Sequence, residues 1–286
     1  MNNVWVVTLL FWPGVVVLCA GINMLISWTF SWQEIILDIC IGVLAGYFLY
    51  AGAHHAGGHP GLHGAEAFFL VFSHGVFGWI WASSAAFRKA VGDPTTFIWM
   101  MAGIRVGATL WTAALDRASV EIGARLDAGP FFFSLLVAPA KLLFSVVTSA
   151  VGMLIWLAGV FWAIIAAIIR QTKKGTAGAT PGPEAHAGFA GGIFFTEFKP
   201  GPEDPYATTL GFTVHTWYGN TPFKHELYHT RQYIYLSDWL IPMWCVGLLW
   251  SVIAQAIDLA KKRISSVSFY QATGPGNPIE IPAYKL

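Results

Sequence analysis

The sequence predicts a polytopic α-helical integral membrane protein with about five or six membrane segments and a small α+β domain near the C-terminus. Of its 286 residues, 56% are hydrophobic and only 11% are charged, whereas a soluble domain carries about 25% charged residues. The apolar residues also gather in runs of about 20, the length that a helix needs to cross the hydrocarbon of a bilayer. A net charge of +1 offers no basic surface for nucleic acid. The expected surroundings are therefore a lipid bilayer.

The first 130 residues contain four of these runs, so region 1–130 is predicted to be a helical region of four spans. The runs are residues 4–28, 35–53, 66–87 and 95–115. A polar loop, 116–130, follows them. Residues 131–169 contain one charge, Lys141, and are too long for one upright span. They fit either a single tilted helix or a tight hairpin.

The rest of the chain, residues 170–286, contains the water-compatible part. Residues 170–190 are rich in Gly, Pro and Thr and predict a flexible linker. The domain that follows, 191–286, begins with two expected strands, 191–198 and 207–219, the second with Leu210, Phe212 and Val214 on one side. A helix is expected to start at Pro222. The last apolar run, 239–259, predicts a membrane-embedded segment within this domain.

The expected helix after Pro222 carries the pattern H-E-x-x-H, formed by His225, Glu226 and His229. Residues i and i+4 lie on one face of a helix, so both imidazoles can reach one zinc ion. Glu226 is rotated by about 100° from His225, which frees it to take a proton from water as a general base. Gln232 continues the same face. The pattern predicts a zinc site, against the alternative of an ordinary polar helix at the membrane surface.

The strand ATTLGFTV, the helix HELYHTRQY and the later stretch NPIEIPAY resemble the minimal zincins, a glutamate-zincin group of membrane-associated metallopeptidase-like proteins. The resemblance covers residues 190–286. It implies that His225 and His229 bind Zn²⁺, that Glu226 is the general base and that Glu280 is the third ligand. His215 is the alternative third ligand. Pro282 departs from the pattern, because it falls inside the element that carries the glutamate.

The position of Glu280 adds a condition. If 239–259 crosses the membrane once, Glu280 emerges on the face opposite to His225. A shared ion then requires 239–259 to dip into the membrane and return, with Pro242 and Gly247 as the points where its helix breaks.

Other polar residues within the apolar regions have less specific interpretations. Four histidines, His54, His55, His59 and His63, lie in one Gly-rich loop that fits either a connecting loop or a metal-sensing loop. His74 is expected to be a hydrogen-bonded residue of the bundle. Asp38 and Arg105 lie inside spans, where an unpaired charge is costly, so we expect them to face the interior and to pair.

The sequence is compatible with three functions. The first is a membrane-integrated zinc metalloprotease that cuts a protein substrate near the membrane surface. The second is a non-catalytic scaffold or accessory subunit that assembles with partner subunits of a membrane complex. The third is a small transporter using the histidine loop. Counting five spans before the strands, the positive-inside rule places the zincin-like segment in the cytoplasm, in a bacterial inner membrane. If 131–169 is instead a hairpin, the segment lies on the other side of the membrane.

Overall fold

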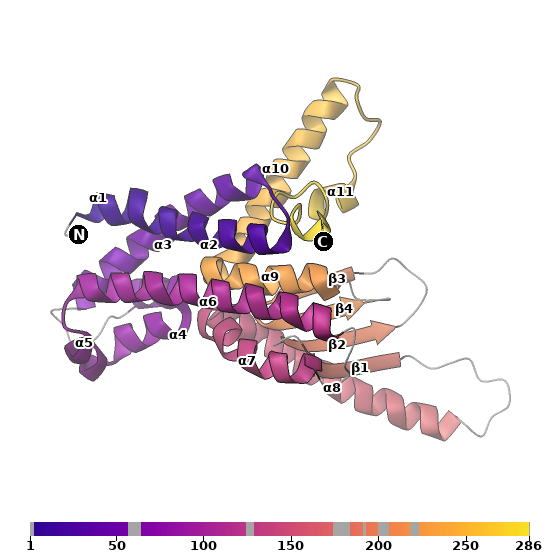
Figure 1. The fold of residues 1–286 in the computed structure, drawn as a ribbon. Helices are drawn as coiled ribbons and strands as arrows, with labels where there is room; N and C mark the ends of the chain where they lie inside the picture. Colours follow the sequence, from indigo (N-terminus) through magenta and orange to yellow (C-terminus); the bar gives the residue numbers. More distant parts are fainter. Residues whose placement is uncertain are drawn as a thin grey trace.

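The computed structural model describes residues 3–56, 64–123, 129–173, 184–190, 193–199, 206–217 and 223–285, and these are mostly helical (Figure 1). The helical elements are α1 (Val4–Val6), the π-helical turn η1 (Val7–Phe11), α2 (Trp12–Ser27), α3 (Trp32–His55), α4 (Ala65–Ser83), α5 (Ala85–Val91), α6 (Pro94–Gly123), α7 (Gly129–Phe144), α8 (Val146–Lys173), α9 (Phe223–Leu236), the 3-10 turn η3 (Ser237–Trp239), α10 (Leu240–Ala260), α11 (Phe269–Thr273) and the 3-10 turn η4 (Ala283–Lys285). The strands are β1 (Glu184–Ala190), β2 (Ile193–Lys199), β3 (Tyr206–Leu210) and β4 (Thr213–Trp217).

Within the described part of the chain, six helical stretches are long and apolar enough to cross a membrane, judged by length and composition. They are Val4–Ser27, Trp32–His55, Ala65–Ser83, Pro94–Ala118, Val146–Ile169 and His225–Ala260. This number agrees with the predicted five or six membrane segments. Large apolar side chains such as Leu154, Phe161 and Leu249 are exposed on the outer faces of these helices, as a lipid environment allows.

Helix α9 lies inside the helical bundle, although it is the most polar of the long helices. It packs against α2, α3, α6 and α7, and every residue from Glu226 to Asp238 is buried. Burying polar groups is costly unless they find hydrogen-bond partners. The bundle supplies such partners: for example, the Arg231 guanidinium donates to Ser27 Oγ at 3.0 Å.

The four strands form one sheet in the order β1-β2-β4-β3, in which β2 and β4 are parallel and the other two pairs are antiparallel. All four strands contact α8, and β3 also contacts α9. The sheet therefore lies beside the start of α9, at one end of the bundle (Figure 1).

The prediction of one strand over 207–219 is wrong, because this stretch forms the hairpin of β3 and β4. Gly211 has φ 62°, a left-handed backbone that glycine adopts at little cost, and the chain reverses there. Phe212 lies in that turn rather than in a strand with Leu210 and Val214.

Three other boundaries differ from the prediction. Helix α6 continues to Gly123 through the predicted loop, and its Asp116 forms a buried ion pair with Lys141 at 2.9 Å. Of the two alternatives for segment 131–169, the single helix is wrong, because the segment is interrupted at Ser145 and forms two helices, α7 and α8. The predicted linker 170–190 ends in strand β1; its residues 174–183 lie outside the described ranges.

The predicted break of segment 239–259 is also wrong, because α10 runs without interruption through Pro242 and Gly247. Pro242 lies in the first turn of α10, where its missing N–H leaves no helical hydrogen bond unmade. The chain returns only after α10. Helix α10 projects from the bundle, and the segment after it folds back towards α9 (Figure 1).

The returning segment, residues 264–285, is held along α10 by hydrogen bonds between a side chain of one and the backbone of the other. Gln255 on α10 accepts from the Ser268 N–H at 2.7 Å, and Asn277 Nδ2 donates to the Trp244 carbonyl at 3.1 Å. Gly247 faces Asn277 so closely that a Cβ there would lie 2.1 Å from Asn277 Oδ1. The missing side chain of Gly247 thus lets the returning chain approach, and Glu280 reaches α9 without a break in α10.

Candidate metal centre

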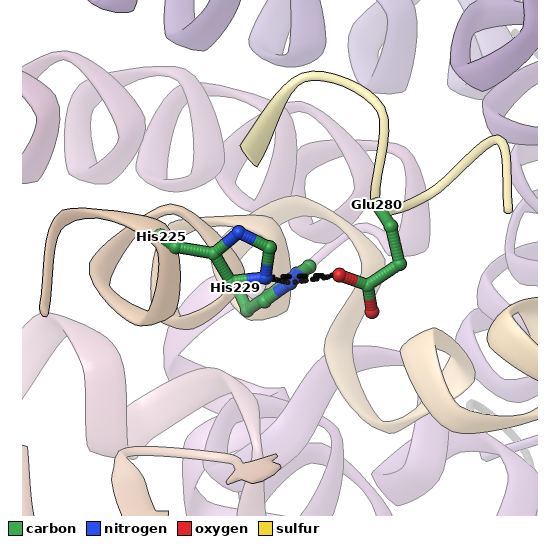
Figure 2. Close-up of side chains that lie close together, drawn as sticks. All are labelled: His225, His229 and Glu280. Carbon is green, nitrogen blue, oxygen red and sulfur yellow. Dashed lines mark hydrogen bonds and ion pairs between the residues drawn. The ribbon is translucent and has the colours of Figure 1, made fainter. Parts of the chain in front are cut away.

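The side chains of His225, His229 and Glu280 converge on one point (Figure 2). Glu280 Oε2 lies 2.9 Å from His225 Nε2 and 3.0 Å from His229 Nε2, and the two Nε2 atoms are 3.1 Å apart. The histidines lie one turn apart on α9, whereas Glu280 comes from the returning segment. Among the described residues, these three form the one group of at least three His, Cys, Asp or Glu side chains placed to hold a metal ion.

Glu280 is fixed by α10 as well as by the histidines. The Trp244 indole donates to Glu280 Oε1 at 2.8 Å, so Oε2 is the oxygen left to face the imidazoles. Burial raises the pKa of the Glu280 carboxyl, but the neighbouring imidazoles of His229 and His225 outweigh burial and hold that pKa below its usual range. The carboxyl is therefore a charged acceptor at neutral pH.

Glu226 is turned towards the same point without joining the group. Its Oε1 lies 4.0 Å from His225 Nε2. Its Oε2 accepts a hydrogen bond from the Thr209 hydroxyl on β3. The sheet thus orients the carboxylate whose role the sequence predicts to be that of a base.

The donor atoms fit a zinc ion. Two imidazole nitrogens and one carboxylate oxygen are the protein ligands of one class of catalytic zinc site, which keeps a fourth position for water. Atoms bonded to one tetrahedral zinc at about 2.1 Å lie about 3.4 Å from each other, and the three separations here are within half an ångström of that value. Each of the two histidines also has a supporting partner. His229 Nδ1 donates to Gln232 Oε1 at 2.7 Å, and the Tyr284 ring packs edge-on against His225 with centroids 4.7 Å apart. Metal-binding histidines usually have such partners.

His215, the alternative third ligand, lies elsewhere. It is buried on β4, 3.1 Å from the Thr213 hydroxyl, and it is absent from the converging group. Burial lowers the pKa of His215 to about 4, and a hydrogen bond with the backbone of Gly152 on α8 opposes this shift only in part. His215 is thus a neutral side chain between the sheet and α8.

Within the part of the chain that the structure describes, the other histidines do not join this group. His74 is confirmed as a hydrogen-bonded bundle residue: its Nε2 donates to the Ala45 carbonyl at 3.1 Å. In the histidine loop, His55 pairs with Glu66 at 2.8 Å, and His59 and His63 lie outside the described residues.

The expected pair of Asp38 and Arg105 does not form. The Arg105 guanidinium donates to the Ile234 carbonyl at 2.7 Å, to Ser237 Oγ at 2.8 Å and to the Ser73 carbonyl. Ile234 lies in the last turn of α9, Ser237 directly follows that helix, and Ser73 lies on α4. Arg105 thus links α6 to α9 and α4. Asp38 is fully buried, and neither of its oxygens has a hydrogen-bond partner among the described residues.

Sequence reasoning missed several residues that support the centre, and chiefly Glu34. It accepts hydrogen bonds from Gln232, Tyr235 and Tyr228. Glu34 stands in a short polar turn between two apolar runs, where a carboxylate normally faces water. The available signal was its position three residues after Ser31, which places it in the first turn of a membrane helix. No comparable feature of the sequence indicates the roles of Thr209 and Trp244.

If the centre holds zinc, replacing Gly247 with alanine is expected to weaken zinc binding by about tenfold. The added Cβ would overlap Asn277 Oδ1, and Asn277 positions the turn before Glu280 through a hydrogen bond from the Ile279 N–H. Overpacking costs about 1–3 kcal/mol, and about 1.4 kcal/mol corresponds to tenfold in affinity. A competition titration with a chelating dye measures the change. Gly103→Ala on α6, where a Cβ meets nothing within 4 Å, is the control. Equal zinc affinity of the two variants would contradict the role of Gly247.

Comparisons of this chain with protein-family models, with curated proteins and with solved structures find no match.

Proposed function

We propose that this chain is a membrane-integrated zinc metallopeptidase of the minimal-zincin kind, in which His225, His229 and Glu280 bind the ion and Glu226 is the general base. The observation that carries the proposal is the meeting of two Nε2 atoms and one carboxylate oxygen, all about 3 Å apart. The sequence pattern supplies the histidines, and the fold brings Glu280 from 51 residues beyond His229.

The proposed reaction assigns separate roles to the bound ion, Glu226 and Thr209. A bound zinc ion supplies a Lewis acid and lowers the pKa of a coordinated water to about 7. Glu226 Oε1 faces the centre and takes a proton from the water that attacks the peptide carbonyl carbon. The Thr209 hydroxyl occupies Oε2, so Oε1 is the oxygen that receives the proton. The same carboxyl then delivers that proton to the leaving nitrogen as the C–N bond breaks.

One observation favours the non-catalytic alternative. The ligand side chains are only 8–13% exposed, and the Tyr284 ring packs against His225. A closed site of this kind also suits a structural ion that fastens the returning segment to α9. The chain would then be a scaffold or accessory subunit of a membrane complex.

Chelation of the purified full-length protein separates the two functions. If the chain is a peptidase, cleavage of a peptide library stops when a chelator removes the metal and resumes when Zn²⁺ is returned. If the site is structural, no preparation cleaves peptides, and chelation lowers the thermal unfolding temperature instead. Cleavage that survives full removal of the metal would contradict both.

For the location, we propose the bacterial inner membrane with the centre near the cytoplasmic side. Among the described residues, five of the six candidate spans precede the strands, and the 16-residue helix α7 is not one of these spans. With five crossings before the strands, the positive-inside rule favours a cytoplasmic centre. A reporter fused near residue 180 is expected to remain in the cytoplasm, and its export would contradict this orientation.

A further inference from the structure

The amide of Gln232 connects the candidate metal centre to a membrane helix. Gln232 is fully buried on α9, three residues after His229. Its Oε1 lies 2.7 Å from His229 Nδ1. Its Nε2 donates to Glu34 Oε1 at 2.7 Å and to the Ile279 carbonyl at 3.3 Å.

The partners of this amide determine which way round it lies. A carboxylate and a backbone carbonyl only accept hydrogen bonds, so the amide NH₂ must face Glu34 and Ile279. Its oxygen then faces His229 and can only accept, so His229 Nδ1 carries a proton. An imidazole that keeps its proton on Nδ1 would bind a metal ion through the lone pair of Nε2, the atom that faces Glu280 and His225. A reversed amide would donate to Nδ1 and put the proton on Nε2, where it would block a metal.

Glu34 is positioned to hold the Gln232 amide in this orientation. It lies in the first turn of α3, where its N–H bonds the Ser31 hydroxyl that caps the helix, and it is fully buried. Its carboxylate also accepts from the hydroxyls of Tyr235 at 3.1 Å and Tyr228 at 3.2 Å. All three donors come from α9. The contact with Gln232 is the shortest of the set and is shorter than the contact from Gln232 to Ile279.

We propose that Glu34 is a positioning residue of the metal centre, which acts through Gln232 to hold His229 in the tautomer that binds the ion. This inference rests on the proposed function, because it assigns a role towards the metal that His229 would bind. Glu34 touches neither the metal ligands nor the point where they meet. Glu34 acts only through the amide of Gln232, which lies 198 residues further along the chain. A residue of α3 thus helps to set the metal affinity of the centre.

A mutant cycle on the full-length protein in detergent tests this role, with Zn²⁺ affinity measured by competition with a chelating dye. Glu34→Gln keeps the shape but offers an NH₂ as well as an oxygen, so the Gln232 amide can reverse. Losing an outer partner of a ligand typically costs 10–100-fold in metal affinity, and we expect a loss in that range. Gln232→Leu is expected to lose as much. Because Glu34 acts through Gln232, the double variant should bind zinc no more weakly than Gln232→Leu alone.

Asp38→Asn is the matched control. It makes the same change from a carboxyl group to an amide on the same helix, one turn further on, at a fully buried side chain without a hydrogen bond to α9 among the described residues. It is expected to keep the wild-type zinc affinity. Thermal unfolding of every variant, measured without metal, separates a general loss of stability from a loss of affinity.

Three results would overturn the inference. The first is a Glu34→Gln variant that binds zinc as tightly as the wild type. The second is a double variant in which the two losses multiply, which would show that Glu34 does not act through Gln232. The third is a loss of affinity in Asp38→Asn as large as that in Glu34→Gln. A wild-type protein that binds no zinc overturns the metal centre itself, and with it this role of Glu34.

Discussion

Replacing Glu226 with glutamine is expected to lower peptidase turnover by about 10²–10⁴-fold, the usual contribution of general-base catalysis. The amide keeps the shape of the side chain and its hydrogen bond with Thr209, but it cannot take a proton. Because Glu226 lies beside the ligand atoms rather than among them, zinc should remain bound. Turnover and zinc content are measured on the same preparation.

Glu66→Gln serves as the control for this change. Glu66 is an exposed carboxylate that pairs with His55, away from the centre, and its loss should leave turnover intact. If Glu226→Gln cleaves peptides at the wild-type rate, the general-base role is wrong. If neither the wild type nor any variant cleaves peptides while all of them hold zinc, the scaffold function replaces the peptidase.

Replacing His229 with alanine is expected to remove the metal altogether. His229 Nε2 is one of three atoms that meet at the centre, and its loss leaves one imidazole and one carboxylate to hold the ion. The loss of affinity should therefore exceed the 10–100-fold that follows when an outer partner is removed. Peptidase activity should disappear together with the metal.

His215→Ala is the matched control for His229→Ala. It removes another buried histidine, which packs on β4 against α8 and stands outside the converging group. The His215 variant is expected to lose stability but to retain zinc. A His215 variant without zinc, or a His229 variant that keeps it, would show that the ligands are assigned wrongly. Zinc content after gel filtration in metal-free buffer distinguishes these results.

The membrane helices could be predicted from the sequence, because hydropathy is a sum over neighbouring residues. The same local reasoning indicated helix α9 after Pro222 and placed His225 and His229 on one face of it. It failed where one residue reverses the chain, as Gly211 does between β3 and β4. It also failed for α10, because a proline in a first turn and a glycine opposite Asn277 look in sequence like helix breaks.

Some residues of the candidate centre could likewise be predicted from local sequence, and others could not. The two histidines and Glu226 follow from a pattern five residues long. Glu280 was predicted only through the resemblance to the minimal zincins, and the path that brings it to α9 depends on the long-range contacts of 264–285 with α10. Glu34 and Thr209 act on the centre from a membrane helix and from a strand. These contacts join residues far apart in the sequence and follow no sequence pattern, so they are found only in the folded structure.

The X-ray absorption spectrum of zinc in the purified full-length protein tests the metal centre most directly. We expect about one zinc per chain, bound by two imidazole nitrogens with oxygen completing the shell, as for catalytic sites of this donor set. Two imidazoles correspond to His225 and His229, and the oxygens include Glu280. The contrary result is a chain that binds no stoichiometric zinc, or one whose zinc is bound by sulfur from Cys19, Cys40 or Cys245.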